Sequence, residues 1–123
     1  MKVLFSIKPK FASKIFEGIK RFESRRLVFK SKEVSKIVVY ASAPISKVIV
    51  TFEIEHIIQK EFEELLDETK NFSGITKTYF DQYFIGKEEG FAISVKNPKL
   101  YESPQNLKEK FDIVTPQSFA YMK

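Results

Sequence analysis

All three arginines of this 123-residue chain lie in one short segment, together with a lysine and a glutamate. The segment runs from Gly18 to Arg26 and reads Gly-Ile-Lys-Arg-Phe-Glu-Ser-Arg-Arg. Cations that flank an aromatic ring and a carboxylate are typical of a cleft that holds a polar or anionic ligand. A solvated edge strand, in which lysine and glutamate prevent aggregation, has a similar composition. The segment is therefore the first place to look for chemistry.

In an extended backbone, alternate side chains share a face, so this segment divides into two groups. One group is Lys20, Phe22 and Ser24, and the other is Arg21, Glu23 and Arg25. In a binding protein, Lys20, Arg25 and the upstream Lys8 would hold phosphate or a base edge, while Glu23 accepts from a base amine or orients the cations. In an enzyme, Lys20 and Glu23 would be catalytic, because a buried lysine beside a glutamate can lose its proton at working pH.

The charge of the chain is unevenly distributed. The net charge is +5, but the first 50 residues carry 12 Lys and Arg against 3 acidic residues, and the remainder carries 9 against 13. A basic half beside an acidic half favours a one-sided electrostatic footprint for phosphate-bearing partners. A lysine-rich composition that only aids solubility is the alternative, since arginines are few.

Several classes of chemistry are excluded by composition. The chain has no cysteine, a single histidine (His56) and four dispersed glycines, which argues against thiolate or multi-histidine metal sites, a histidine triad and a phosphate-binding glycine loop. We expect no metal and no cofactor. The apolar run at the N-terminus is too short for a signal peptide, and no apolar run has transmembrane length. The expectation is a cytoplasmic protein without a membrane partner.

The pattern of apolar residues predicts short helices between strands. Strands are expected at 3–7, 36–41, 47–58, 90–96 and 99–103, with the second and third joined as a hairpin, and helices at 9–17, 60–69, 76–86 and 106–110. Gly18 is expected to end the first helix as a left-handed cap. Without a repeated βα unit, the fold class is α+β: one domain with a mixed, mostly antiparallel sheet, curled into a small barrel with peripheral helices.

Five stretches carry a resemblance to a known family. They are Gly-x-Lys-x-x-Glu-x-Arg from Gly18, Ser-Ile-Lys-Pro at 6–9, Val-Val-Tyr-Ala-Ser at 38–42 with Pro44, Gly-Phe-Ala-Ile at 90–93, and Pro-Gln-Ser-Phe at 116–119. Together they resemble the ASCH domain family, a branch of the PUA-like β-barrels. The resemblance spans almost the whole chain. It implies a single ASCH-type domain over residues 1–123, with a cleft beside the first helix to which Ser42 and Ser118 contribute.

The resemblance also implies a partner, namely RNA or a modified nucleoside or nucleotide. One bacterial branch of the family removes the acetyl group from N4-acetylcytidine with a Lys, a Thr three residues later and a more distant Glu. Lys20 stands at the position of that Lys, and Glu23 stands at the position of that Thr. Binding of nucleic acid is thus the first hypothesis and hydrolysis of an acylated nucleoside is the alternative. A protein-interaction domain is a third reading, and the oligomeric state stays open.

Overall fold

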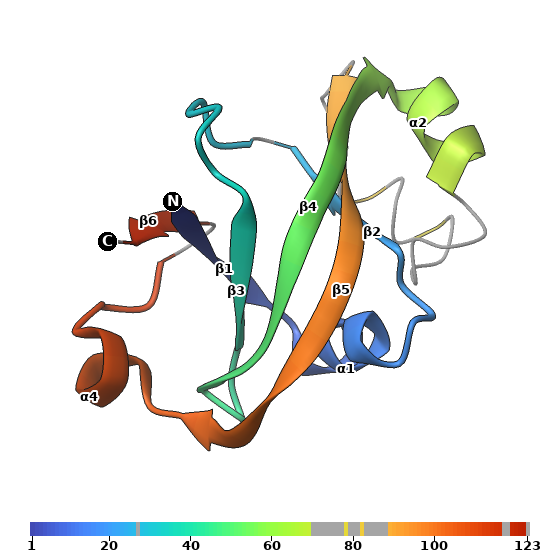
Figure 1. The fold of residues 1–123 in the computed structure, drawn as a ribbon. Coiled ribbons are helices and arrows are strands. Elements are labelled where there is room, and N and C mark those ends of the chain that lie inside the picture. Colours follow the sequence, from blue (N-terminus) through green and yellow to red (C-terminus); the bar gives the residue numbers. More distant parts are fainter. Residues whose placement is uncertain (27, 70–77, 79–81, 83–88, 117–118, 123) are drawn as a thin grey trace.

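The computed structural model describes residues 1–26, 28–69, 78, 82, 89–116 and 119–122 (Figure 1). The elements are β1 (Lys2–Ile7), α1 (Pro9–Phe16), β2 (Phe22–Arg25), β3 (Lys36–Ala41), β4 (Lys47–Glu61), α2 (Phe62–Thr69), β5 (Glu89–Gln105), α4 (Leu107–Phe111) and β6 (Phe119–Met122). The predicted α+β class is confirmed. The predicted aromatic stripe at positions 79, 80, 83 and 84 lies outside the described residues.

The strands form one sheet with the order β2-β5-β4-β3-β1-β6. β1 and β3 run parallel, and the other described pairs are antiparallel. The sheet is therefore mixed and mostly antiparallel, as predicted. It is not closed among the described strands, because the four-residue strands β2 and β6 stand at opposite ends of the order. The barrel closure expected from the sequence is not confirmed.

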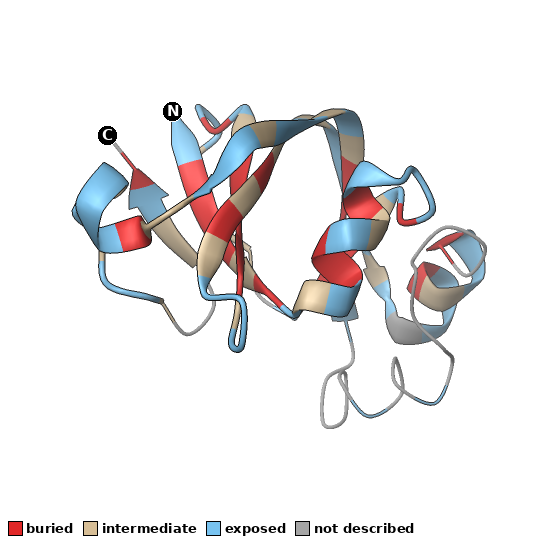
Figure 2. Ribbon diagram, turned by 90° about the horizontal axis from the view of Figure 1, so that it is seen from below, coloured by how far each residue is buried: buried red, intermediate tan, exposed pale blue. Residues whose placement is uncertain are grey.

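The two faces of the sheet bury different side chains (Figure 2). On the inner face, α1 packs its buried residues Phe11, Ala12 and Ile15 against alternate residues of the strands: Val3, Phe5, Ile37, Val39, Val50 and Phe52. On the outer face, α4 places Leu107 against Leu4, Val38, Tyr40 and Val48. Because strand residues alternate between faces, neighbours such as Val39 and Tyr40 serve separate cores.

The turn from α1 into β2 positions the arginine-rich segment. Pro9 occupies the first turn of α1, where its missing N–H is tolerated. Gly18 follows the helix with φ 81°, a left-handed conformation that glycine adopts without a Cβ penalty. The backbone N–H groups of Ile19 and Lys20 both donate to the carbonyl oxygen of Lys14 at 3.1 Å. The helix end thus fixes the backbone of Lys20 before β2 begins at Phe22.

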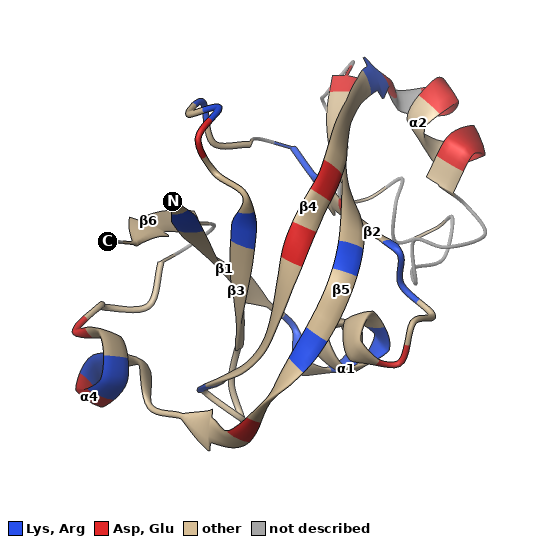
Figure 3. Ribbon diagram, in the orientation of Figure 1, with Lys and Arg blue, Asp and Glu red and all other residues tan. Residues whose placement is uncertain are grey.

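The second half of the sheet is built from two long strands. The predicted β3–β4 hairpin is present, with its turn at residues 42–46. β5 is one continuous strand where the sequence indicated two, because it passes Asn97 (φ 48°) as an irregularity in its pairing with β4. α2 carries acidic side chains on its surface (Figure 3). No helix in the described part of the chain is both long and apolar enough to cross a membrane.

Candidate functional site

Lys20, Glu23 and Arg25 meet in the interior of the protein and are called the charged cluster below. Their exposed fractions are 2%, 5% and 7%. The Nζ of Lys20 lies 3.3 Å from Oε1 of Glu23, and Nη1 of Arg25 lies 3.6 Å from Oε2 of the same carboxylate. One carboxylate therefore bridges two buried cations, as the sequence-based convergence of these three residues requires.

Aromatic rings of the inner face surround the charged cluster. The Cζ of Arg25 lies 4.1 Å from the ring centroid of Phe5, and the Nζ of Lys20 lies 5.7 Å from that of Phe11. β2 is an edge strand, yet the solvated-edge interpretation is wrong for these buried side chains. The predicted face of Lys20 is also wrong, because Lys20 precedes the first residue of β2 and turns its amine towards Glu23.

The electrostatics of the cluster are unusual for a small domain. Burial lowers the pKa of Lys20 below its ordinary value, and the attraction of Glu23 only partly opposes this effect. Two cations and one carboxylate leave an excess positive charge in the core when Lys20 is protonated. An apolar side chain of the same volume would commonly serve stability as well or better than such a group. A buried lysine with a depressed pKa and a specific partner is a candidate functional residue.

Two of the remaining predicted site residues lie at the carboxyl ends of the parallel strands β1 and β3. Lys8 is exposed at the start of α1, directly after β1. Ser42 follows β3 and donates its backbone N–H to the carbonyl oxygen of Ile7 at 2.9 Å. Ser118 lies outside the described residues. The predicted ligand site therefore has a buried part, the charged cluster, and a surface part at these strand ends.

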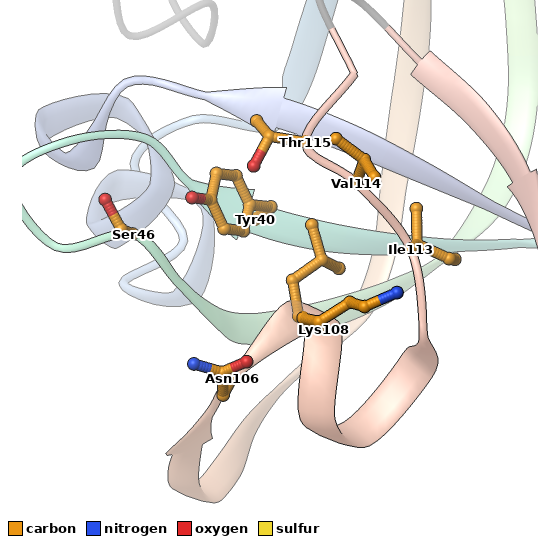
Figure 4. A pocket seen from close by; sticks show the side chains of 8 residues that line it. Tyr40, Ser46, Asn106, Lys108, Ile113, Val114 and Thr115 are labelled. Atoms are coloured by element: carbon orange, nitrogen blue, oxygen red, sulfur yellow. The ribbon is translucent and has the colours of Figure 1, made fainter.

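A pocket of about 430 Å³ opens on the outer face, where residues 40–46 meet residues 106–115 (Figure 4). Its lining consists of Tyr40, Ser46, Asn106, Leu107, Lys108, Ile113, Val114 and Thr115. Hydroxyls of Tyr40 and Ser46 and the amide of Asn106 lie on one side, with the aliphatic chains of Ile113 and Val114 opposite (Figure 4). The Asn106 side chain also caps α4 by accepting from the N–H of Glu109 at 3.0 Å.

Sequence reasoning did not predict this pocket. Its two halves are separated by about sixty positions, and they meet only because β5 returns along β4 to the end of β3. The sole local signals were Tyr40 and Ser42 within one of the resembling stretches. Neither signal indicates that the segment after α4 would cover them.

Solved structures with the same fold are available for comparison. An ASCH protein from Zymomonas mobilis matches with a TM-score of 0.91 and 26% identity, over 99% of this chain and 87% of that chain. A Tyr-to-Phe variant of that protein matches with the same TM-score and 25% identity, over 99% and 90%. The N-terminal domain of McrB from Staphylothermus marinus has a TM-score of 0.57 and 15% identity, over 93% and 81%, and is a likeness of fold alone.

Comparison by sequence gives weaker relationships. No protein-family model matches the chain. The large ribosomal subunit protein uL22 of Ureaplasma parvum serovar 3 is 26% identical over 124 residues, which cover 98% of this chain and 39% of that protein. The chain thus spans about two fifths of the length of this curated relative.

The architecture defines the class first: an α+β domain whose open mixed sheet carries α1 on one face and α4 on the other. Within that class, the chain has the ASCH-domain fold, because the Zymomonas mobilis ASCH structures match it across nearly its full length. The resemblance noted in the sequence is thereby confirmed.

The bridging role of Glu23 predicts a large loss of stability in Glu23→Gln. The amide removes the negative charge and leaves Lys20 and Arg25 buried without their shared counter-ion, which typically costs about 3–5 kcal/mol. Urea unfolding monitored by circular dichroism measures the difference. Glu63→Gln on the exposed surface of α2 is the matched control and should change the free energy of unfolding by less than about 0.5 kcal/mol. Equal effects of the two variants would contradict the bridging role.

The lowered pKa of Lys20 predicts a pH dependence of stability with a defined sign. Below the lowered pKa both states hold the proton, whereas between it and the ordinary value of 10.5 only the unfolded state does. The free energy of unfolding of the native protein should therefore rise with pH in this window, relative to Lys20→Met. Lys60, whose pKa is raised by the hydrogen bond to Glu68, provides the control, since its contribution has the opposite sign. Parallel pH profiles of native protein and Lys20→Met would refute the assignment.

Proposed function

We propose that this chain binds RNA or a modified nucleotide, with one nucleotide held in the pocket at Tyr40. The observation that carries the proposal is the pocket, which combines a nucleotide-sized volume with an aromatic ring, hydroxyls, an amide and aliphatic walls. RNA-binding proteins recognise unstacked bases through aromatic contacts and hydrogen bonds to base edges. The ASCH-domain fold and the basic first half of the chain support the same partner.

The surface residues predicted from the sequence fit the phosphate side of such a ligand. Ser46, which lines the pocket, donates its backbone N–H to the carbonyl oxygen of Ser42 across the turn, at 3.4 Å. Ser42 is in turn held next to Ile7, the residue before Lys8. We therefore assign Lys8 and Ser42 to the rim of the site. A large-ribosomal-subunit protein among the relatives supports RNA over DNA as the partner.

A pair of opposite substitutions at Val114 tests the pocket. Val114 is 79% exposed, so a charged residue there has little cost in folding. Val114→Glu should weaken binding of a fluorescent single-stranded RNA about three- to tenfold at low salt by repelling phosphate, and Val114→Lys should not weaken it. Titrations at 50 and 200 mM salt give both affinities.

The control for this test is Ile57→Glu, a comparable exposed apolar position on β4. It changes the net charge by the same amount and should have a smaller effect than Val114→Glu. Equal affinities for the two Val114 variants would remove the pocket from the binding site. A native protein that binds no RNA even at low salt would remove the proposed function itself.

A second candidate function is hydrolysis of an acylated nucleoside such as N4-acetylcytidine, and the lowered pKa of Lys20 favours it. In this scheme Glu23 takes a proton from water, whose oxygen adds to the acetyl carbon. The C–N bond then breaks, the Lys20 ammonium gives a proton to the departing nitrogen, and Glu23 returns its proton to Lys20. The products are acetate and cytidine. Depression of its pKa by burial makes Lys20 a readier proton donor for this step.

Incubation with N4-acetylcytidine, followed by chromatography of the nucleosides, tests hydrolysis. Native protein should release cytidine, and both Lys20→Met and Glu23→Gln should lower the rate at least a hundredfold, as expected for loss of a proton-transfer group. Lys60→Met, far from the charged cluster on β4, is the control and should retain the native rate. Intact substrate after incubation with the native protein, or full activity in folded Lys20→Met, would exclude this reaction.

A further inference from the structure

The outer face of the sheet carries lysines from three different strands. Lys2 of β1 is directly beside Lys36 of β3 in the strand register, Lys36 is beside Glu53 of β4, and Glu53 is beside Lys96 of β5. Lys99 of β5 follows opposite Thr51, one step closer to α4. We call Lys2, Lys36, Lys96 and Lys99 the lysine row. The charged positions on β1, β3, β4 and β5 can be followed in Figure 3.

Strand alternation places the lysine row on the same face as the pocket. Lys2 and Lys36 are each two residues before Leu4 and Val38, which belong to the outer core together with Tyr40. Lys99 is two residues before Tyr101, which packs against that core and contacts Phe111 edge to face. The row and the pocket are therefore parts of one surface.

Two carboxylates of β4 face the lysine row. Oε2 of Glu53 accepts from the side-chain amide of Asn97 at 2.9 Å, and Oε2 of Glu55 accepts from Oγ of Ser94 at 3.4 Å. The Asn97 hydrogen bond lowers the pKa of Glu53, and the nearby lysines at positions 96, 36 and 99 add to the effect. On α4, Lys108 is paired with Asp112 at 2.6 Å. Four ammonium groups therefore face two carboxylates, which leaves an excess of positive charge.

Stability alone does not account for this arrangement. Opposite charges on neighbouring strands contribute roughly 0.2–1 kcal/mol, which the pairs of Glu53 with Lys36 and Lys96 can supply. Lys2 beside Lys36 is a like-charge pair, and such pairs are destabilising. An anionic partner that lies across the strands would offset this repulsion.

The dimensions of the row suit a chain of phosphates. Four adjacent strands separated by about 4.8 Å each give a width of about 14 Å. This width corresponds to roughly four nucleotides of a stacked strand at about 3.4 Å per nucleotide. β5 connects the row to the pocket, since it runs from Lys96 through Lys99 and Tyr101 to Gln105, next to Asn106 of the pocket.

We propose that the lysine row binds the phosphates of a single-stranded RNA that continues beyond the nucleotide held in the Tyr40 pocket. The inference rests on the proposed RNA-binding function and extends it to a ligand of several nucleotides that follows β5. Phosphate contacts of this kind position the strand, while the pocket selects the base.

The test compares a dinucleotide with a twelve-nucleotide oligouridylate, each fluorescently labelled, at 50 and 200 mM salt. The triple variant Lys36→Gln, Lys96→Gln, Lys99→Gln should bind the dinucleotide as the native protein does and the longer RNA more weakly. Each lost contact lowers the salt slope for a single strand by about 0.7, so three contacts reduce the fourfold-salt effect by roughly 15- to 20-fold. Thermal unfolding checks that the variant is folded.

The control is the triple variant Lys30→Gln, Lys32→Gln, Lys60→Gln, which has the same net charge but leaves the outer face intact. It should bind the longer RNA with nearly the native salt slope. If the two triple variants behave alike, the lysine row is not a binding surface, although the pocket proposal survives. If native protein binds neither RNA, both proposals fail. Loss of binding to phosphatidylserine vesicles in the first variant, with RNA binding retained, would make the row a membrane-facing surface and overturn the inference.

Discussion

Burial of the Lys20 ammonium is the interaction on which the N-terminal half of the domain depends. The amine reaches Glu23 only because Gly18 turns the chain out of α1 and the Lys14 carbonyl holds the following N–H groups. Glu23 also binds Arg25, whose guanidinium lies against Phe5 of β1. The cluster therefore connects α1, β2 and the centre of the sheet. A substitution that removes its carboxylate affects all three elements, because the charges have no water to replace it.

The alternation of strand residues separates two kinds of chemistry. The inner face holds the charged cluster, in which burial changes proton affinity, and the outer face holds a pocket with hydroxyl, amide and aromatic groups. β3 contributes to both, since Val39 packs inwards and Tyr40 lines the pocket. The two candidate functions therefore use different faces, and a defect in one need not impair the other. Binding needs an accessible surface, which the pocket has, whereas hydrolysis needs the depressed pKa that only the buried lysine has.

Local patterns in the sequence predict much of this fold. β-branched runs predict β3 and β4, and Pro9 with Gly18 predicts both ends of α1. The convergence of Lys20, Glu23 and Arg25 was also predictable from their spacing after that helix. The side to which Lys20 points was not, because it depends on where β2 begins. The single long β5 and the pocket depend on pairing between distant segments, for which periodicity within one segment has no signal.

The position of β4 limits how strongly the domain can attract RNA. The basic half of the chain forms β1, α1, β2 and β3, but the sheet order inserts β4, with Glu53 and Glu55, between β3 and β5. These carboxylates lie among the lysines of the outer face, so the surface has less positive charge than the sequence of the first half alone indicates. Affinity from phosphate contacts is then modest and sensitive to salt. Discrimination among ligands must therefore come from the Tyr40 pocket, whose hydrogen-bonding groups are set by the fold and are less screened than exposed charges.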